Sequence, residues 1–415
     1  MSMNDTPRGE RMHIAFFGRR NAGKSSLVNA VTNQQMSIVS EVRGTTTDPV
    51  VKSMELLPLG PVVIIDTPGF DDEGALGELR VQKTREILRR TDVAVLVADM
   101  AYGLTDSDRE LMRLFSEQDT PCILAWNKCD LVKPSLQENT TEKDAGSAPD
   151  EGGIAEQISV SALTGENVDE LKNTIARIGK LAEAKRERAL ISDLIRPMDL
   201  VILVIPIDFA APKGRLILPQ VQVIRDALDH GARAMCVRES ELAETLEKLD
   251  EKPVLVITDS QAFRAVDRIV PDDIPLTSFS ILMARYKGAL KVQLKGIRAL
   301  KELKDGDRVL ISEGCTHHRQ CGDIGTVKLP AWIREYSGKD LIFETSSGLS
   351  FPEDLQQYAV IVHCGACMLN EKEVAARNKR AAEQGVPITN YGMTIAEVNG
   401  ILDRALRPLP AEDLV

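Results

Sequence analysis

Short apolar runs alternate with helical patterns between residues 13 and 160. The runs at residues 93–98 and 122–126 are apolar throughout, and a helical pattern separates them. Such runs are typical of parallel strands that are buried on both faces of a sheet. The pattern therefore predicts an α/β domain. Its other expected elements are strands at residues 13–17 and 157–160, a helix at 25–31, and a hairpin pair at 50–57 and 61–66.

A second α/β pattern follows the first. Strand-like runs at residues 200–206, 234–237 and 254–258 are separated by helical patterns at 221–228 and 241–249. This order predicts a small parallel sheet without a phosphate loop of its own. A small sheet usually has an exposed edge, and pairing with a second copy of the chain would bury it. We therefore expect a dimerisation domain here, with a simple spacer domain as the alternative.

Polar and charged stretches indicate where the domains end. Residues 135–153 are rich in Glu, Asp, Ser, Thr and Gly, which is typical of a mobile surface insertion. From residue 168 to about residue 190 the pattern is helical and becomes highly charged, as in a solvated helix that bridges domains. The expected domains are residues 1–185, 186–275 and 276–415.

Composition narrows the class of protein. The 415 residues are 43% apolar and carry a net charge of −11, which argues against a broad, non-specific contact with nucleic acid. Seven scattered cysteines do not resemble a disulfide framework. The first 12 residues have no apolar core for a signal peptide, and the longest apolar stretch, residues 200–207, is too short to span a bilayer. We expect a cytoplasmic protein with no membrane partner.

A phosphate-binding motif follows the first expected strand. Residues 18–25 read G-R-R-N-A-G-K-S and match G-x-x-x-x-G-K-S between a strand and a helix, the context that this motif requires. Its backbone N–H groups and the helix N-terminus would surround the phosphates. Lys24 would reach the β- and γ-phosphates, and Ser25 would bind magnesium. The predicted phosphate contacts are Asn21, Ala22, Gly23, Lys24, Ser25 and Ser26.

Three further motifs complete a GTP site. Asp66 would hold magnesium through water and the Gly69 N–H would sense the γ-phosphate, both in D-T-P-G, while Thr46 in G-T-T-T-D would complete the magnesium shell. Asp130, in N-K-C-D, can accept two hydrogen bonds from guanine but would face an unpaired acceptor in adenine, so GTP is preferred. The expected catalytic residues are Lys24, Thr46, Asp66 and Gly69, and the expected base pocket is Asn127, Lys128, Asp130, Ser161 and Ala162.

Two details of this site bear on the rate of hydrolysis. Phe70 follows D-T-P-G, so the glutamine that orients water in Ras-like enzymes is missing. Asn21 and the G-T-T-T loop resemble GTPases of the Era and TrmE type, in several of which an asparagine holds a potassium ion in place of an arginine finger. The resemblance implies slow, potassium-stimulated hydrolysis. The alternative is that Asn21 only shapes the loop.

Cysteines and histidines concentrate in the third expected domain. Cys315 and His317 form C-x-H, and after 45 residues His363, Cys364 and Cys367 form H-C-x-x-C. The thiolate is the metal-binding form of cysteine, and C-x-x-C lets one turn offer two thiolates. Three thiolates with an imidazole suit zinc. Three cysteines also suit a 4Fe–4S cluster with one iron free of thiolate, and the chemistry alone leaves both metals open.

The residues around these cysteines resemble the HydF family, the maturation GTPases of FeFe hydrogenases. The resemblance rests on E-G-C-T-H-H at residues 313–318, D-I-G at 323–325, V-H-C-G-A-C-M-L-N at 362–370 and T-N-Y-G at 389–392. It covers essentially the whole chain. It implies an α/β protein with a P-loop GTPase domain, a small parallel α/β dimerisation domain and a C-terminal iron–sulfur cluster-binding domain.

The resemblance also implies ligands and partners. A 4Fe–4S cluster would be held by Cys315, Cys364 and Cys367, with an exchangeable fourth ligand for which His317 and His363 are candidates. The protein would be a homodimeric scaffold that receives the di-iron precursor, with its CO and CN ligands, made with the radical-SAM maturases HydE and HydG. It would then deliver this precursor to the hydrogenase apoprotein.

Two other functions remain as alternatives. An Era-like GTPase acting on ribosome or tRNA, with structural zinc at the cysteines, would need a basic RNA-binding surface, and the acidic net charge counts against it. A metal-regulated interaction module would bind iron without activating a hydrogenase. We favour the scaffold, with no nucleic-acid partner.

Overall fold

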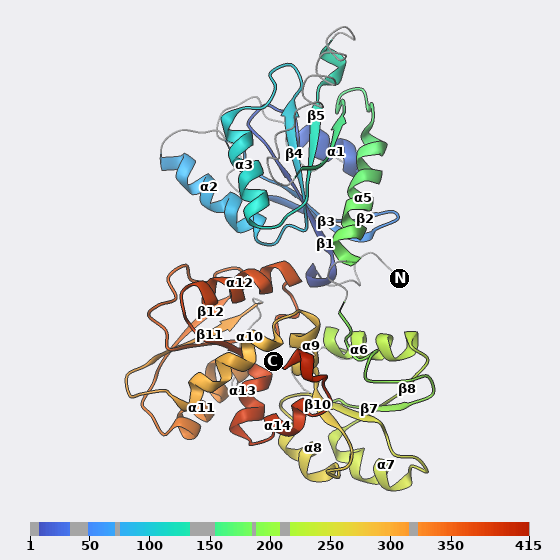
Figure 1. Cartoon of the computed structure of the whole chain (residues 1–415), viewed down its shortest axis with the longest axis vertical. Coiled ribbons are helices and arrows are strands. Elements are labelled where there is room, and N and C mark those ends of the chain that lie inside the picture. The colour runs from blue at the N-terminus through green and yellow to red at the C-terminus, as the bar shows by residue number, and fades with distance from the viewer. Residues whose placement is uncertain are drawn as a thin grey trace. The chain divides into compact units, whose positions relative to one another are not determined.

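The computed structural model describes residues 8–33, 49–70, 75–132, 154–184, 188–207, 216–314 and 323–414. The insertion expected at residues 135–153 lies outside the described residues. The chain divides into two compact units, Met1–Glu187 and Arg188–Val415. Figure 1 shows each unit as strands covered by helices, and each unit is described by itself below. In the described part of the chain, no helix has both the length and the apolar character needed to cross a membrane.

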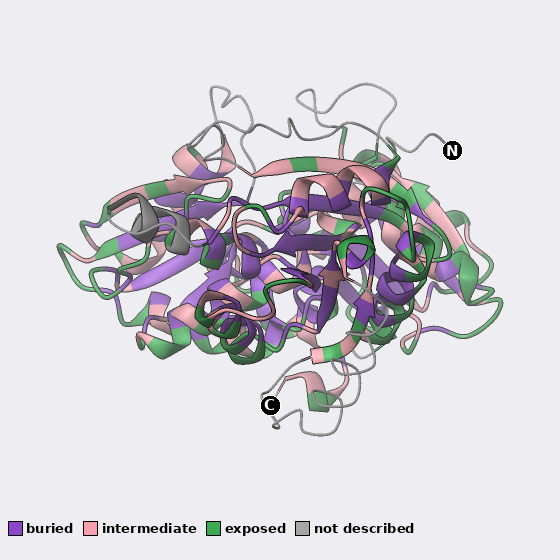
Figure 2. Ribbon diagram, turned by 90° about the horizontal axis from the view of Figure 1, so that it is seen from above, coloured by how far each residue is buried: buried purple, intermediate pink, exposed green. Residues whose placement is uncertain are grey.

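The first unit contains a six-stranded sheet in the order β2-β3-β1-β4-β5-β6. Only β2 is antiparallel, and it pairs with β3 as the expected hairpin. The predicted buried runs are buried throughout residues 93–98 and in all of residues 122–126 except Trp126. Figure 2 shows several strands coloured as buried. The bounds are β1 Met12–Phe17, β2 Val50–Leu56, β3 Gly60–Asp66, β4 Val93–Asp99, β5 Cys122–Asn127 and β6 Ile154–Ser159.

Helices cover both faces of this sheet. One apolar cluster joins α1 and α5 to alternate strand residues such as Ile14 and Val95. A second cluster joins α2 and α3 to the intervening residues, such as Ala15 and Leu96. This alternation follows from the two-residue period of a strand. The helices are α1 Lys24–Thr32, α2 Ala75–Leu88, α3 Asp106–Glu117 and α5 Val168–Ala184.

The second unit contains two fully parallel four-stranded sheets. The first has the order β10-β9-β7-β8. Its fourth strand, β10, lies beyond residue 275, where the sequence pattern placed the end of the second domain. The strands are β7 Leu200–Val204, β8 Arg233–Val237, β9 Leu255–Thr258 and β10 Leu276–Ser278, and the helices are α6 Leu218–Asp229, α7 Leu242–Lys248, α8 Phe263–Ile269 and α9 Phe279–Tyr286.

The second sheet of this unit has the order β12-β11-β13-β14. Parallel pairing aligns Ser312 of β11 with His363 of β13 and places the carboxyl ends of both strands at one edge. The strands are β11 Arg308–Glu313, β12 Ile342–Ser347, β13 Val360–His363 and β14 Ile388–Asn390. The helices are α10 Leu290–Ile297, α11 Leu329–Ser337, α12 Glu371–Glu383, α13 Tyr391–Val398 and α14 Leu402–Leu406.

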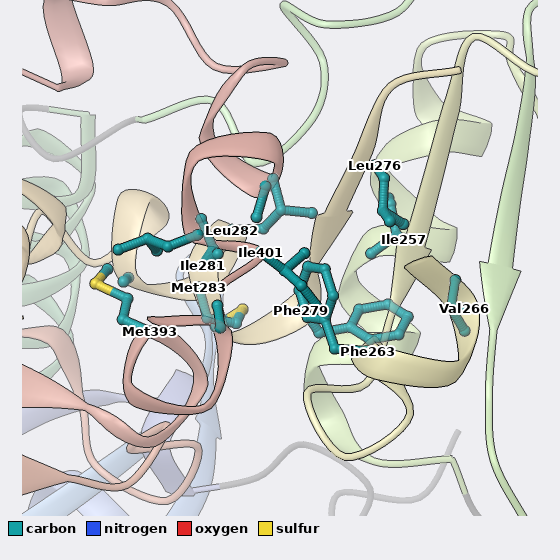
Figure 3. Packing of buried hydrophobic residues seen from close by; sticks show 14 of the residues in the cluster. Ile257, Phe263, Val266, Leu276, Phe279, Ile281, Leu282, Met283, Met393 and Ile401 are labelled. Carbon is teal, nitrogen blue, oxygen red and sulfur yellow. The ribbon is translucent and has the colours of Figure 1, made fainter. Parts of the chain in front are cut away.

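One apolar core runs through both sheets of the second unit. It contains Ile257 of β9 and Phe263 of α8, and also Met393 of α13 and Ile401. Figure 3 shows these side chains on either side of α9, whose residue Phe279 lies against Phe263. Because α9 contributes to the core on both sides, the two sheets belong to one compact unit.

Candidate functional site

The phosphate-binding loop connects β1 to α1. Gly18, Asn21 and Gly23 have positive φ angles of 144°, 62° and 86°. A Cβ on Gly23 would clash with the side-chain amide of Asn127. Glycine at this position therefore provides both the backbone conformation and the close approach of the base-binding motif.

The residues expected to bind magnesium lie together at the start of α1 and the end of β3. The Ser25 hydroxyl donates to Asp66 Oδ2 at 2.6 Å, and Lys24 Nζ is 3.7 Å from Asp66 Oδ1. Hydroxyl and carboxylate oxygens are the hard ligands that magnesium prefers, so these residues fit the ion. Gly69 lies against the loop, because a Cβ there would be 3.1 Å from the Arg20 nitrogen. Thr46 lies outside the described residues.

The predicted base-binding motifs are held against the predicted phosphate loop by hydrogen bonds. Asn127 Nδ2 donates to the Ala22 carbonyl at 2.9 Å, and Asn127 Oδ1 accepts from the Ala162 N–H at 3.1 Å. Lys128 Nζ donates to the Asn21 carbonyl at 2.8 Å. The structure thus brings together three segments that are far apart in the sequence. Ser161 is buried beside Ala162, Asp130 is exposed, and Ser26 lies in the first turn of α1.

Asp99 also belongs to this site, although the sequence motifs do not predict it. Its carboxylate accepts from Lys128 Nζ at 2.7 Å, and it is 3% exposed at the end of β4. One feature of the sequence indicates its role: Asp99 is the first charged residue after the buried apolar run at residues 93–98. Cys129 is structural here, since burial and the neighbouring Glu166 raise the pKa of its thiol to about 11.

The H-C-x-x-C segment begins where β13 ends. Cys364 Sγ accepts the N–H groups of Gly314 at 3.0 Å and Ala366 at 3.4 Å. Burial raises the pKa of the Cys364 thiol, whereas these two donors act in the opposite direction. Gly314 directly precedes Cys315 in the sequence. The β11 and β13 ends are therefore in contact beside Cys364.

The described residues contain only part of the predicted ligand set. Cys315 and His317 lie outside them, and within them no three His, Cys, Asp or Glu side chains are arranged to hold a metal ion. Cys364 and Cys367 are both partly accessible and separated by a single tight turn, in which Ala366 has a φ of 54°. Two cysteines in one turn, with N–H groups directed at a sulfur, fit a metal group held by thiolates.

His363 is buried, and both of its ring nitrogens have partners. Nε2 lies 2.9 Å from an Arg377 guanidinium nitrogen, and Nδ1 lies 2.9 Å from the Cys364 carbonyl. Burial, and then the positive charge of Arg377, lower the pKa of His363 to about 3. The ring is therefore neutral at physiological pH.

A buried lysine also contacts this loop. Lys287, which follows α9, is 9% exposed. Its Nζ donates to the carbonyls of Ala366 at 2.5 Å and Leu369 at 3.1 Å. The loop that carries Cys364 and Cys367 is thus fixed by N–H donors at its sulfur and by an ammonium group at its carbonyls.

This fold and these sites define a P-loop GTPase joined to an α/β unit with a cysteine-bearing loop. Family models described as "Hydrogen maturase F dimerization domain" and "Hydrogen maturase F tetramerization domain" match residues 190–288 and 291–408, together more than half of the chain. A third, "50S ribosome-binding GTPase", matches residues 13–128. The chain belongs to the HydF family of hydrogenase maturation GTPases. It carries a GTPase domain and domains described for self-association.

Curated relatives that are GTPases match about two fifths of the chain. The chain is 37% identical over 170 residues to tRNA modification GTPase MnmE of Roseiflexus sp. (strain RS-1), covering 40% of this chain and 35% of the relative. It is 35% identical over 178 residues to GTPase Der of Akkermansia muciniphila, covering 40% of this chain and 37% of the relative. The chain thus spans about a third of the length of these relatives.

Solved structures match at low scores. Aquifex aeolicus Era bound to GDP and aluminium fluoride is 21% identical with a TM-score of 0.35, covering 55% of this chain and 92% of that one. A probable GTP-binding protein, engB, is 26% identical with a TM-score of 0.32, covering 40% of this chain and 98% of that one.

Proposed function

We propose that this protein is a GTP-hydrolysing scaffold that carries the di-iron precursor of the FeFe-hydrogenase active site and delivers it to the hydrogenase apoprotein. The observation that supports it most strongly is the match of two HydF-specific domains to residues 190–288 and 291–408, of which the second contains Cys315, Cys364 and Cys367. HydE and HydG would be the maturases that supply the cargo. An Era-like function on RNA is less favoured, because the acidic net charge of −11 opposes it.

The three cysteines would hold a resident 4Fe–4S cluster in this proposal. When bound, the cluster would supply an iron without a thiolate, at which a ligand can be exchanged. The Gly314 and Ala366 N–H groups, which donate to Cys364 Sγ, would stabilise the thiolate form of Cys364. A boundary near residue 289 would separate the dimerisation domain from the cluster domain, since β10 and α9 complete the first sheet and its cover.

The nucleotide site would act as a slow switch. Asn21 is exposed in the phosphate loop with a φ of 62°, and its carbonyl accepts from Lys128. Its side chain would be available for a potassium ion. Phe70, which takes the place of a water-orienting glutamine, is 8% exposed. Hydrolysis would therefore be slow without potassium and faster with it.

Anaerobic purification tests the metal assignment. We expect about four irons and four sulfides per chain, and a reduced-cluster EPR signal that is lost in Cys364→Ala. A Cys122→Ala variant is the matched control, because Cys122 is a buried cysteine of β5 in the other unit. Stoichiometric zinc without iron, even after reconstitution, would contradict the scaffold function.

Hydrogenase activation tests the switch. Lys24 is 8% exposed beside Asp66, and Lys24→Ala removes the phosphate contact. We expect this variant to load the precursor but to activate apo-hydrogenase much more slowly than the wild type. Equal activation by both proteins would show that GTP does not control delivery.

A further inference from the structure

His363 is the last residue of β13 and directly precedes the loop that carries Cys364 and Cys367, called the cysteine loop below. Its contacts determine which of its ring nitrogens carries the proton. It is 4% exposed, and its neighbour Arg377, from α12, is 3% exposed on its side chain. Phe351 covers both groups, with its ring centroid 6.4 Å from that of His363 and 5.0 Å from the Arg377 guanidinium carbon. The pair is thus enclosed and not open to solvent.

Every nitrogen of the Arg377 guanidinium has a partner. Nε donates to Glu373 at 2.8 Å, one terminal nitrogen donates to the Gly348 carbonyl at 2.7 Å, and the other contacts His363 Nε2 at 2.9 Å. A planar guanidinium with three directions fixed cannot rotate away from one partner without losing the others. Arg377 is therefore anchored independently of His363.

This geometry determines the tautomer of His363. A guanidinium has only donors, so His363 Nε2 must accept. The proton is then on Nδ1, which donates to the Cys364 carbonyl. Both nitrogens of the neutral ring are used, and neither has a lone pair left for a metal.

We infer that His363 is a positioning residue that links Arg377 to the cysteine loop, and that it is not a ligand of the metal group. The Arg377–His363 contact fixes the ring, and the ring fixes the backbone of Cys364 through its carbonyl. For His363 to bind iron through Nε2, the buried Arg377 would lose a partner, which is costly for an enclosed charge. The fourth ligand position therefore belongs to another group.

This inference rests on the proposed cluster, and its experiment begins with spectroscopy. The variant His363→Gln keeps an acceptor oxygen for Arg377 but has no imidazole nitrogen. We expect the reduced cluster of this variant to show the same ¹⁴N couplings in pulsed EPR as the wild type, with equal iron content. An imidazole coupling that is present in the wild type and lost in His363→Gln would identify His363 as a ligand and overturn the inference.

The second part tests the role of Arg377. Arg377→Met should release iron to a chelator several-fold faster than the wild type, whereas Lys379→Met, at an exposed position on the same helix, should not. Equal release rates from Arg377→Met and Lys379→Met would show that Arg377 does not position the loop.

A measurement on the metal-free full-length chain separates this inference from the proposed function. Backbone amides of residues 364–370 should exchange with deuterium faster in Arg377→Met than in the wild type. His363→Gln should exchange like the wild type, because its amide offers both an acceptor for Arg377 and a donor for the Cys364 carbonyl. If the wild type bound no iron, the scaffold function would fail while this exchange still tested the Arg377 contact. Unchanged exchange in Arg377→Met would contradict the inference alone.

Discussion

Lys287 is a buried lysine within residues 190–288, which the dimerization-domain model matches, and it contacts the cysteine loop. Lys287→Met would leave the Ala366 and Leu369 carbonyls without their ammonium donor. We expect the second unit to lose about 1–3 kcal/mol of unfolding free energy, the usual cost of an unpaired buried polar group. Lys287→Arg should recover part of this loss, because it restores a charged donor.

Urea unfolding, followed by tryptophan fluorescence, measures this loss of stability. The signal must come from the second unit alone. The chain has two tryptophans, Trp126 in β5 and Trp332 in α11. A Trp126→Phe background leaves Trp332 as the reporter of the second unit. Lys291→Met, at an exposed position in α10, is the control. A Lys287→Met transition that coincides with the control would contradict the role of this lysine.

We predict that Asp99 supports nucleotide binding through Lys128. Asp99→Asn removes the charge that holds Lys128 in the position from which it contacts Asn21. We expect GTP to bind about tenfold more weakly, which corresponds to about 1.4 kcal/mol. Titration with a fluorescent GTP analogue gives the dissociation constant, and Asp169→Asn on α5, whose side chain is 92% exposed, is the control. Equal dissociation constants for Asp99→Asn and Asp169→Asn would show that Asp99 has no role in GTP binding.

The buried thiol of Cys122 makes the first unit sensitive to alkaline pH. Burial raises its pKa from 9.0 to about 12. Between these values the unfolded chain releases a proton that the folded chain keeps, so unfolding free energy falls as pH rises, by about 1.4 kcal/mol per pH unit. Cys122→Val should remove this contribution. Urea unfolding between pH 9.5 and 10.5, in a Trp332→Phe background, compares the slopes, which should differ by about that amount.

At the scale of elements, the contact between α10 and β14 requires a helix residue without a side chain. A Cβ on Gly296 would clash with the Ile388 carbonyl, which is backbone and cannot move aside. Alanine normally stabilises a helix by about 1 kcal/mol relative to glycine. Here we expect the reverse, a loss of about 2 kcal/mol from overpacking.

Gly179 in α5 provides a matched comparison. A Cβ there would meet Met12 Sδ at 2.7 Å and Leu59 Cδ2 at 2.9 Å, both ends of flexible side chains. Gly179→Ala should therefore change stability by less than about 1 kcal/mol. Urea unfolding of each variant, with the tryptophan of its own unit as reporter, measures both effects. Equal costs would mean that α10 can shift away from β14.

The elements also show which features the sequence could predict. The buried runs at residues 93–98 and 122–126 predict β4 and β5 because parallel strands covered on both faces are apolar throughout. Motif spacing predicts the residues that meet around Asn127. The Arg377–His363 and Lys287–Ala366 contacts could not be predicted, since they join α12 to β13 and the end of α9 to a loop 79 residues later. Such pairings depend on tertiary packing and leave no periodic pattern.

At the scale of the whole molecule, self-association needs a surface, and we predict that the edge strand β8 is this surface. It is an outer strand of its sheet, and Arg233 and Cys236 are exposed among the described residues. The Arg233 N–H donates to the Asp199 carbonyl, and the Val237 carbonyl accepts from Ile205, so residues 233, 235 and 237 face β7. The backbone groups of residues 234 and 236 therefore point away from the sheet. Among the described residues β8 pairs only with β7, so these groups would be available to a strand from a second copy.

Proline at residue 236 would block this edge without disturbing the β7–β8 ladder. Proline has no N–H, and the lost donor is one that faces away from β7. We expect Cys236→Pro to halve the mass measured by light scattering, whereas Cys236→Ser, which keeps the N–H and removes the thiol, should not change it. Unchanged GTP hydrolysis and Trp332 unfolding would show that both units remain folded. An unchanged mass in folded Cys236→Pro would mean that self-association uses another surface. The outer strand β12 of the second sheet would then be the next edge to test.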